Sequence, residues 1–502
     1  MSDVYSFYKP LRNHLRQINV EESLSVIRAY TQYFQFDEPI PNDIQVHRDA
    51  LVRERFKRPF FEWELELLGK EVILNSDSSP TRESIKKWDY LAAAVNKLRA
   101  LENEIVGLYP KGSILTEMYR IAHRQFPWQV RLNDLWLVRY FKIFSHPKLD
   151  LIIQRVLKLS TEKLYAMGLA FTGWYLEHLA FHLPPQIEIK GITADDFKGF
   201  IEHFSLSIDE LRARLWRNQQ FNENFVYSFN DLRAYPLIRM PVSGRNCLVA
   251  PLPPLLFRRF TEGLYYEICD EKDFGEPFGE SFQNYTGEVI SAGFRESVKV
   301  ISEFEYFGPK KERKDSIDWI VIDKTGVLLV ECKTRRVELK AKIEIVNEEA
   351  LIRQVEKMGE FMVQVYKTIH DYRTGLYDSK ITYDPQKHHF PVIVTLEEWF
   401  FFGGQIEGLL NAKVRELLTK ANIPSSYVDD MPYSICSIRE FEAMTQIMRQ
   451  VGIEKIMREK TSDAEKRKWL FTPFLHACFP DECKKIEFLF QSDFERLASA
   501  YE

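Results

Sequence analysis

Apolar residues recur at helical spacing through most of the first 221 residues. Between residues 91 and 108 they fall at intervals of three and four, which places them on one face of a helix. Residues 22–36, 114–126 and 161–183 carry similar patterns. We therefore predict a large, mainly helical N-terminal domain over residues 1–221.

The pattern changes between residues 222 and 270. Short apolar runs, among them FVYSF and YPLIRMPV, are interrupted there by proline and glycine. Such runs are typical of short strands and turns rather than of helices. This stretch is predicted to be a bridging segment with short strands.

From residue 271 onward, helical runs alternate with strand-like runs. The predicted order is a helix at 278–296, strands at 317–322 and 327–332, a helix at 347–372 and a strand at 390–396. This order indicates an α/β domain with a mixed sheet over residues 271–423. The charged remainder, residues 424–502, is predicted to be a helical C-terminal region.

Composition and charge exclude several classes of protein. The chain has 502 residues, a formal net charge of −5 and six cysteines without the spacing of a disulfide framework. This charge argues against a protein that coats nucleic acid or a membrane with its whole surface. The cysteine pattern and the lack of a secretory signal predict a reduced, cytoplasmic protein. The most apolar stretch, residues 164–183, is interrupted by Glu177, His178 and His182, so we predict a buried helix there and no membrane span.

The two strands at 317–322 and 327–332 carry the most informative pattern. If residues 323–326 form a tight turn, Asp318 lies opposite Glu331. Both strands are apolar on both faces, which is typical of the covered centre of a sheet. Lys333 projects on the same face as Glu331 because the side-chain period of a strand is two.

Two carboxylates that emerge together from such a sheet need a compensating cation. Their hard oxygen atoms suit Mg²⁺ or Mn²⁺. Such an ion can activate a water and offset charge on a phosphate, while the lysine orients the water or helps to deprotonate it. The pattern thus predicts metal-dependent cleavage of phosphodiester bonds, with Asp318 and Glu331 as metal ligands.

Asp318, followed after twelve residues by Glu331-Cys332-Lys333, resembles the signature of the PD-(D/E)xK, restriction-endonuclease-like nuclease superfamily. The resemblance covers residues 271–410 and implies a restriction-endonuclease-like mixed-sheet core. It also implies that Asp318 and Glu331 hold the metal and that Lys333 serves the nucleophilic water. A further acid from the preceding helix is expected, for which Glu280 and Glu288 are both candidates and Glu288 is preferred. Ile317 stands where the motif's name has proline.

Local charge supports a nucleic-acid partner. Ten basic and six acidic residues lie between residues 310 and 342. A basic strip beside a metal site is the electrostatic pattern expected for contact with a phosphate backbone. Lys310, Lys311, Arg335 and Arg336 are therefore predicted to contact nucleic acid, and the resemblance adds Gln354.

The leading hypothesis is a Mg²⁺-dependent deoxyribonuclease, by analogy one of a bacterial or phage-defence setting. Its helical N-terminal region would select substrate, bind a partner protein or mediate assembly as a homo-oligomer. The alternative is a catalytically silent nuclease fold that binds nucleic acid or holds a complex together. The sequence leaves open the choice between DNA and RNA, the specificity, endonuclease or exonuclease action, and the activating signal.

Overall fold

The computed structural model describes residues 4–47, 51, 58–79, 83–108, 114–184, 189–334, 348–400 and 403–499. The chain divides into two compact units. Unit 1 contains the described residues up to Phe274 and those from Asp493 onward, and unit 2 those from Gly275 to Ser492. The segment at 222–270 thus belongs to unit 1, and most of the C-terminal region belongs to unit 2.

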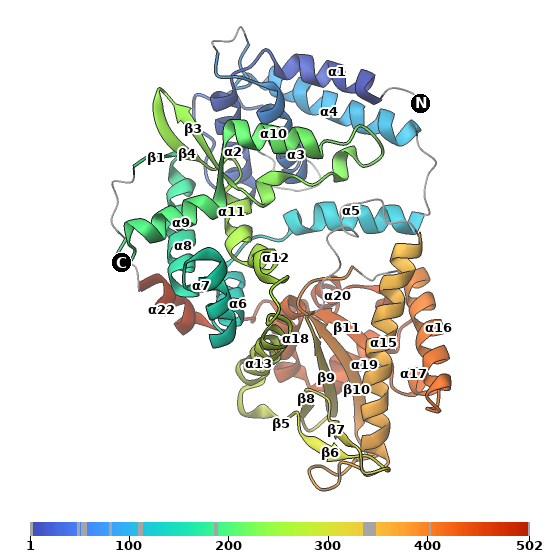
Figure 1. The fold of residues 1–502 in the computed structure, drawn as a ribbon. Coiled ribbons are helices and arrows are strands. Elements are labelled where there is room, and N and C mark those ends of the chain that lie inside the picture. Colours follow the sequence, from blue (N-terminus) through green and yellow to red (C-terminus); the bar gives the residue numbers. More distant parts are fainter. Residues whose placement is uncertain are drawn as a thin grey trace. The chain divides into compact units, whose positions relative to one another are not determined.

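Unit 1 is mainly helical, as its apolar periodicity predicts (Figure 1). Its core is lined by the apolar faces of these helices; residues Leu91, Leu98 and Ile105 of α4, for example, are all buried. The helices are α1 (Val4–Leu15), α2 (Val20–Phe36), α3 (Glu62–Asn75), α4 (Trp88–Leu108), α5 (Ile114–Gln129), α6 (Asp134–Phe144), α7 (Pro147–Leu157), α8 (Thr161–Glu177), α9 (Ala194–Phe204), α10 (Ile208–Asn218), α11 (Pro253–Phe260) and α12 (Tyr265–Ile268).

A small four-stranded sheet of order β1-β4-β3-β2 accompanies these helices. Strands β3 (Leu237–Val242) and β4 (Arg245–Val249) lie in the segment predicted to hold short strands. Strands β1 (Ala180–His182) and β2 (Ser205–Ser207) were not predicted, because three residues carry too little alternation. The helix predicted over 161–183 ends at Glu177, because the chain beyond it pairs with β4 instead of continuing the helix.

Unit 2 is built on a five-stranded sheet of order β11-β10-β9-β8-β5. Strands β5 (Lys299–Ser302), β8 (Trp319–Ile322) and β9 (Gly326–Lys333) are antiparallel, whereas β10 (His388–Thr395) and β11 (Ser434–Ser437) run parallel to β9. The predicted mixed sheet is confirmed. A two-stranded ribbon, β6 (Glu305–Phe307) with β7 (Arg313–Asp315), lies between β5 and β8 in the chain.

Two strands of this sheet were not predicted. Strand β11 lies in the region predicted to be helical, and β5 is a largely exposed edge strand of only four residues. Both are identified only by their pairing with strands distant in the sequence. The described helices of the C-terminal half are α13 (Gly275–Phe294), α15 (Glu348–Arg373), α16 (Gly404–Lys420), α17 (Tyr427–Asp430), α18 (Ile438–Val451), α19 (Ile453–Thr461), α20 (Phe471–Cys478), α21 (Pro480–Cys483) and α22 (Gln491–Ser499).

Helices α13 and α15 cover opposite faces of the sheet (Figure 1). Helix α13 packs on the face that carries Trp319, so closely that a Cβ atom at Gly287 would lie 2.3 Å from the indole ring. Helix α15 lies on the other face, where Phe361 and Gln364 approach Lys333. No described helix is both long and apolar enough to span a bilayer.

Candidate functional site

The β8–β9 hairpin has the predicted register. Ile320 lies opposite Leu329 and Ile322 opposite Val327. The turn is closed by Asp323, whose backbone N–H donates to the carbonyl of Gly326 (3.1 Å) and whose carboxylate accepts from the Gly326 N–H (2.7 Å). The apolar side chains on both faces place the hairpin at the centre of the sheet, and its far end carries the candidate site.

Asp318, Glu331 and Lys333 come together at that end. The carboxylate of Asp318 accepts a 2.6 Å hydrogen bond from the backbone N–H of Cys332, across the hairpin. The Lys333 ammonium donates to Glu331 at 2.6 Å and to Gln364 of α15 at 3.3 Å. Gln364 was not predicted, because its contact depends on how α15 packs against β9.

The two acids lie in surroundings that disfavour their charged forms. Burial and the neighbouring Glu331 charge raise the pKa of Asp318 to about 7, although the Cys332 N–H and the Lys333 charge act in the opposite direction. Burial likewise raises the pKa of Glu331, against the ammonium of Lys333. Only 6% of the Glu331 side chain is exposed, so water does little to stabilise its charge. A bound cation would stabilise the ionised form of both acids.

Glu303 is a third acid at this site that the sequence analysis missed. It directly follows β5, and its backbone N–H donates to the carbonyl of Asp318 at 2.8 Å. Its charge contributes to raising the pKa of both Asp318 and Glu331. Its carboxylate accepts a hydrogen bond from Gln283 at 3.0 Å. Glu303 reaches the site because β5 pairs with β8. The β6–β7 ribbon separates these two strands in the sequence, so the sequence analysis did not find the pairing.

A β-bulge directly precedes Asp318. Glu303 pairs with the backbone of Asp318, whereas the next residue, Phe304, pairs with Ser316, so Ile317 is one extra residue in its strand. Bulges bend a strand and re-aim its side chains, and they are common beside functional sites. Ile317 itself is buried.

The choice between the two glutamates predicted from the preceding helix stays a prediction. Glu280 and Glu288 are exposed residues of α13. That helix packs on the face of the sheet that carries Trp319, opposite the face that carries Glu331 and Lys333. The same helix also supplies Gln283, which donates to Glu303 at 3.0 Å, so α13 reaches the site from the side of β5.

The residues predicted to contact nucleic acid lie in different surroundings. Lys310 and Lys311 are exposed in the loop that joins β6 to β7. Gln354 is buried in α15, about ten residues before Gln364, the glutamine that bonds Lys333. Arg335 and Arg336 lie outside the described residues.

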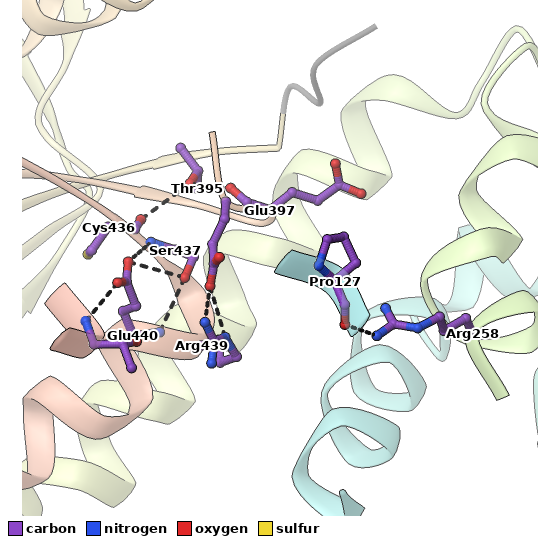
Figure 2. A network of polar contacts seen from close by, with 10 residues as sticks. Pro127, Arg258, Thr395, Glu397, Cys436, Ser437, Arg439 and Glu440 are labelled. Carbon is purple, nitrogen blue, oxygen red and sulfur yellow. Dashed lines mark hydrogen bonds and ion pairs between the residues drawn. The ribbon is translucent and has the colours of Figure 1, made fainter. Parts of the chain in front are cut away.

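The edge of the sheet that carries Lys333 is completed by the ends of two parallel strands. Thr395 of β10 lies beside Lys333. Its hydroxyl donates to the carbonyl of Glu397 (2.7 Å) and lies 3.3 Å from that of Cys436 (Figure 2). Ser437, at the end of β11, caps α18. These bonds fix the edge on which the site is built.

The donor set fits a hard divalent cation. Across the described ranges, no cluster of three or more His, Cys, Asp or Glu side chains is arranged as a metal site. Mg²⁺ does not need one, since one or two carboxylates commonly hold it together with waters and substrate oxygens. Asp318 accepts from the Cys332 N–H and Glu331 from Lys333, and each carboxylate oxygen has a further lone pair that a cation would use.

Comparisons with known proteins add no assignment. No family model matches the sequence, and neither a curated protein nor a solved structure is significantly similar to the chain.

Proposed function

We propose that this protein is a Mg²⁺-dependent nuclease that cleaves phosphodiester bonds, with DNA as its substrate, at the site formed by Asp318, Glu331 and Lys333. One observation carries the proposal: two carboxylates with raised pKa values lie at the end of a covered hairpin, with an ammonium 2.6 Å from one of them. A pair of acids held in surroundings that disfavour their charged forms is typical of a functional site. The resemblance to the PD-(D/E)xK signature and the mixed sheet around it support a restriction-endonuclease-like core.

Asp318 and Glu331 would hold the ion. When bound, it would offset negative charge on the scissile phosphate and favour deprotonation of the attacking water. Because the two acids are fixed by the Cys332 N–H and by Lys333, their oxygens are pre-positioned and the ion would bind without rearranging the sheet.

Lys333 acts on the reacting atoms through the third N–H of its ammonium group. An ammonium has three donors, and Glu331 and Gln364 take two of them. The third orients the attacking water or donates to a phosphate oxygen. The ring of Phe361, 5.2 Å from the Lys333 nitrogen, limits the directions in which that amine can point.

The first test is cleavage of plasmid and linear DNA in Mg²⁺ and in EDTA. We expect Glu331→Ala and Lys333→Ala to reduce cleavage by about a hundredfold or more, because each removes a group that acts in the transition state. DNA binding, measured by gel shift, should persist in both variants. The Asp481–Lys484 pair, exposed in the same unit, supplies the control variants Asp481→Asn and Lys484→Ala.

The outcomes separate the nuclease from a silent nuclease fold. Normal cleavage by well-folded Glu331→Ala and Lys333→Ala would remove the assignment from this site. DNA binding by the wild type, with no Mg²⁺-dependent cleavage of either substrate, would favour the silent fold. Cleavage that EDTA leaves unchanged would exclude the metal-dependent reaction.

A further inference from the structure

The β6–β7 ribbon has two chemically different sides. Its register places Tyr306 opposite Lys314 and Phe307 opposite Arg313. Because successive side chains of a strand point to opposite faces, the first pair lies on one side of the ribbon and the second pair on the other. Tyr306 is buried, whereas 68% of Phe307 is exposed.

The inner side fastens the ribbon to α15. The Tyr306 hydroxyl donates to Asp371 at 2.7 Å, and the Lys314 ammonium binds the same carboxylate at 2.9 Å. The Tyr306 ring also packs edge-on against Tyr377 at 4.8 Å. These contacts hold the ribbon beside the C-terminal part of α15 (Figure 1), so its outer side is presented by a fixed support.

The outer side carries Phe307 with the Arg313–Glu305 pair and Asp315, and the adjoining loop adds positive charge. Phe307 is the most exposed of the large hydrophobic side chains in the described ranges. Lys310 and Lys311 are exposed in the adjoining loop. The described ion pairs of the ribbon join Arg313 to Glu305 and Lys314 to Glu312 and Asp371, which leaves the two loop ammonium groups available to a ligand.

The ribbon is tied closely to the candidate site. Arg313 is only five residues from Asp318, so their Cα atoms can be at most about 18 Å apart. This span corresponds to roughly five nucleotides of a B-form strand. The bulge at Ile317 lies between them and bends the ribbon away from the line of β8.

We propose that Phe307 stacks on an unpaired base and that Lys310 and Lys311 bind phosphates of the same single-stranded DNA segment. The inference rests on the proposed nuclease function and names its substrate as DNA with a single-stranded stretch next to the scissile bond. A ring on a narrow ribbon can stack on a base only where that base has left the duplex, and two adjacent cations match the spacing of a flexible phosphate backbone. Duplex DNA would engage the lysines alone.

The test measures binding of full-length protein to fluorescently labelled oligonucleotides in EDTA, so that cleavage does not interfere. We expect Phe307→Ala and Phe307→Leu to weaken binding of a single-stranded oligonucleotide by about 5- to 150-fold, and Phe307→Trp to retain it. Leucine keeps the apolar area without the planar ring. The double variant Lys310→Ala/Lys311→Ala should reduce the slope of log Kd against log salt by about 1.4. Trp469, a 41% exposed aromatic residue of the same unit, gives the control Trp469→Ala.

Each result decides the inference. Weakened binding of the single strand, with duplex binding changed less than twofold by Phe307→Ala, supports it. Unchanged binding by Phe307→Ala, an equal loss for the duplex or an equal loss in Trp469→Ala overturns it. Failure of this inference can be told apart from failure of the nuclease assignment. If DNA cleavage is lost in Glu331→Ala but normal in Phe307→Ala, only the proposed role of the ribbon is overturned.

Discussion

At the scale of single residues, the main feature is a pair of acids, Asp318 and Glu331, with raised pKa values beside the ammonium of Lys333. Asp318 and Glu331 raise each other's energy when both are ionised, and Glu303 adds to this. Lys333 compensates part of the charge. A divalent cation would compensate the rest, which makes ion binding measurable through stability without any substrate.

We expect Mg²⁺ or Ca²⁺ to raise the melting temperature of the wild-type protein. An ion at a hundred times its Kd stabilises the folded state by about 2.7 kcal/mol, or roughly 5–10 °C for a unit of this size. Asp318→Asn and Glu331→Gln should lose this shift, whereas Asp481→Asn should keep it. Calorimetry in EDTA and in each ion measures the difference, and an equal shift in all variants would place the ion elsewhere.

His389 should make unit 2 less stable in acid. Burial lowers its pKa from 6.5 to about 4, with help from the charges of Arg373 and His388 and against that of Asp384. Its ring stacks on Tyr383 at 4.5 Å. Because the unfolded chain takes up this proton at a higher pH than the folded chain, stability is lost as the pH falls from 6.5 to about 4.

The change His389→Phe tests this dependence. Between pH 7 and pH 4.5 the wild type should lose about 2–3 kcal/mol more unfolding free energy than the variant, since phenylalanine takes up no proton. Urea unfolding at the two pH values measures both proteins. Parallel losses would show that the histidine is not the group responsible.

At the scale of elements, the distance between α13 and β8 is set by Gly287. A Cβ atom there would meet the Trp319 ring at 2.3 Å, whereas a Cβ atom at Gly279 of the same helix would have no neighbour within 4 Å. We expect Gly287→Ala to destabilise the protein by about 1–3 kcal/mol through overpacking. Gly279→Ala should stabilise it by about 0.5–1 kcal/mol, because alanine favours the helix.

Denaturant unfolding of these two variants compares one substitution in two environments of one helix. If Gly287→Ala is as stable as Gly279→Ala, the close approach of α13 to the tryptophan is wrong. Cleavage should fall in Gly287→Ala as well, since Asp318 directly precedes Trp319, the first residue of β8.

The elements that sequence could predict are those fixed by nearby residues. The β8–β9 hairpin follows from two apolar runs and the Asp323–Gly326 turn, and its register brought Asp318 toward Glu331. Glu303 could not be found in this way, because the β5–β8 pairing spans a whole inserted ribbon. Sequence also left the choice between Glu280 and Glu288 open, because the face of the sheet that a helix covers is decided by packing, which the helix's own periodicity does not encode.

At the scale of the whole molecule, the chain enters unit 2 at Gly275 and returns to unit 1 at Asp493. The returning helix α22 contributes buried Leu497, and Asp493 binds Lys142 of α6 at 3.0 Å. We expect Leu497→Ala to lower the melting transition of unit 1 by roughly 5 °C or more. Hydrogen exchange should show faster exchange in the helices of unit 1 and unchanged protection of β8 and β9; a loss confined to unit 2 would contradict this division.

The return of the chain to unit 1 also fixes the order in which the two units are completed during synthesis. At about 5–20 residues per second, a ribosome needs roughly 10–40 s to make residues 275–492. Throughout that time unit 1 lacks α22, and Lys142 still lacks Asp493. The described strands of unit 2 are all made before α22. The part of the protein that is translated first is therefore the last to be completed.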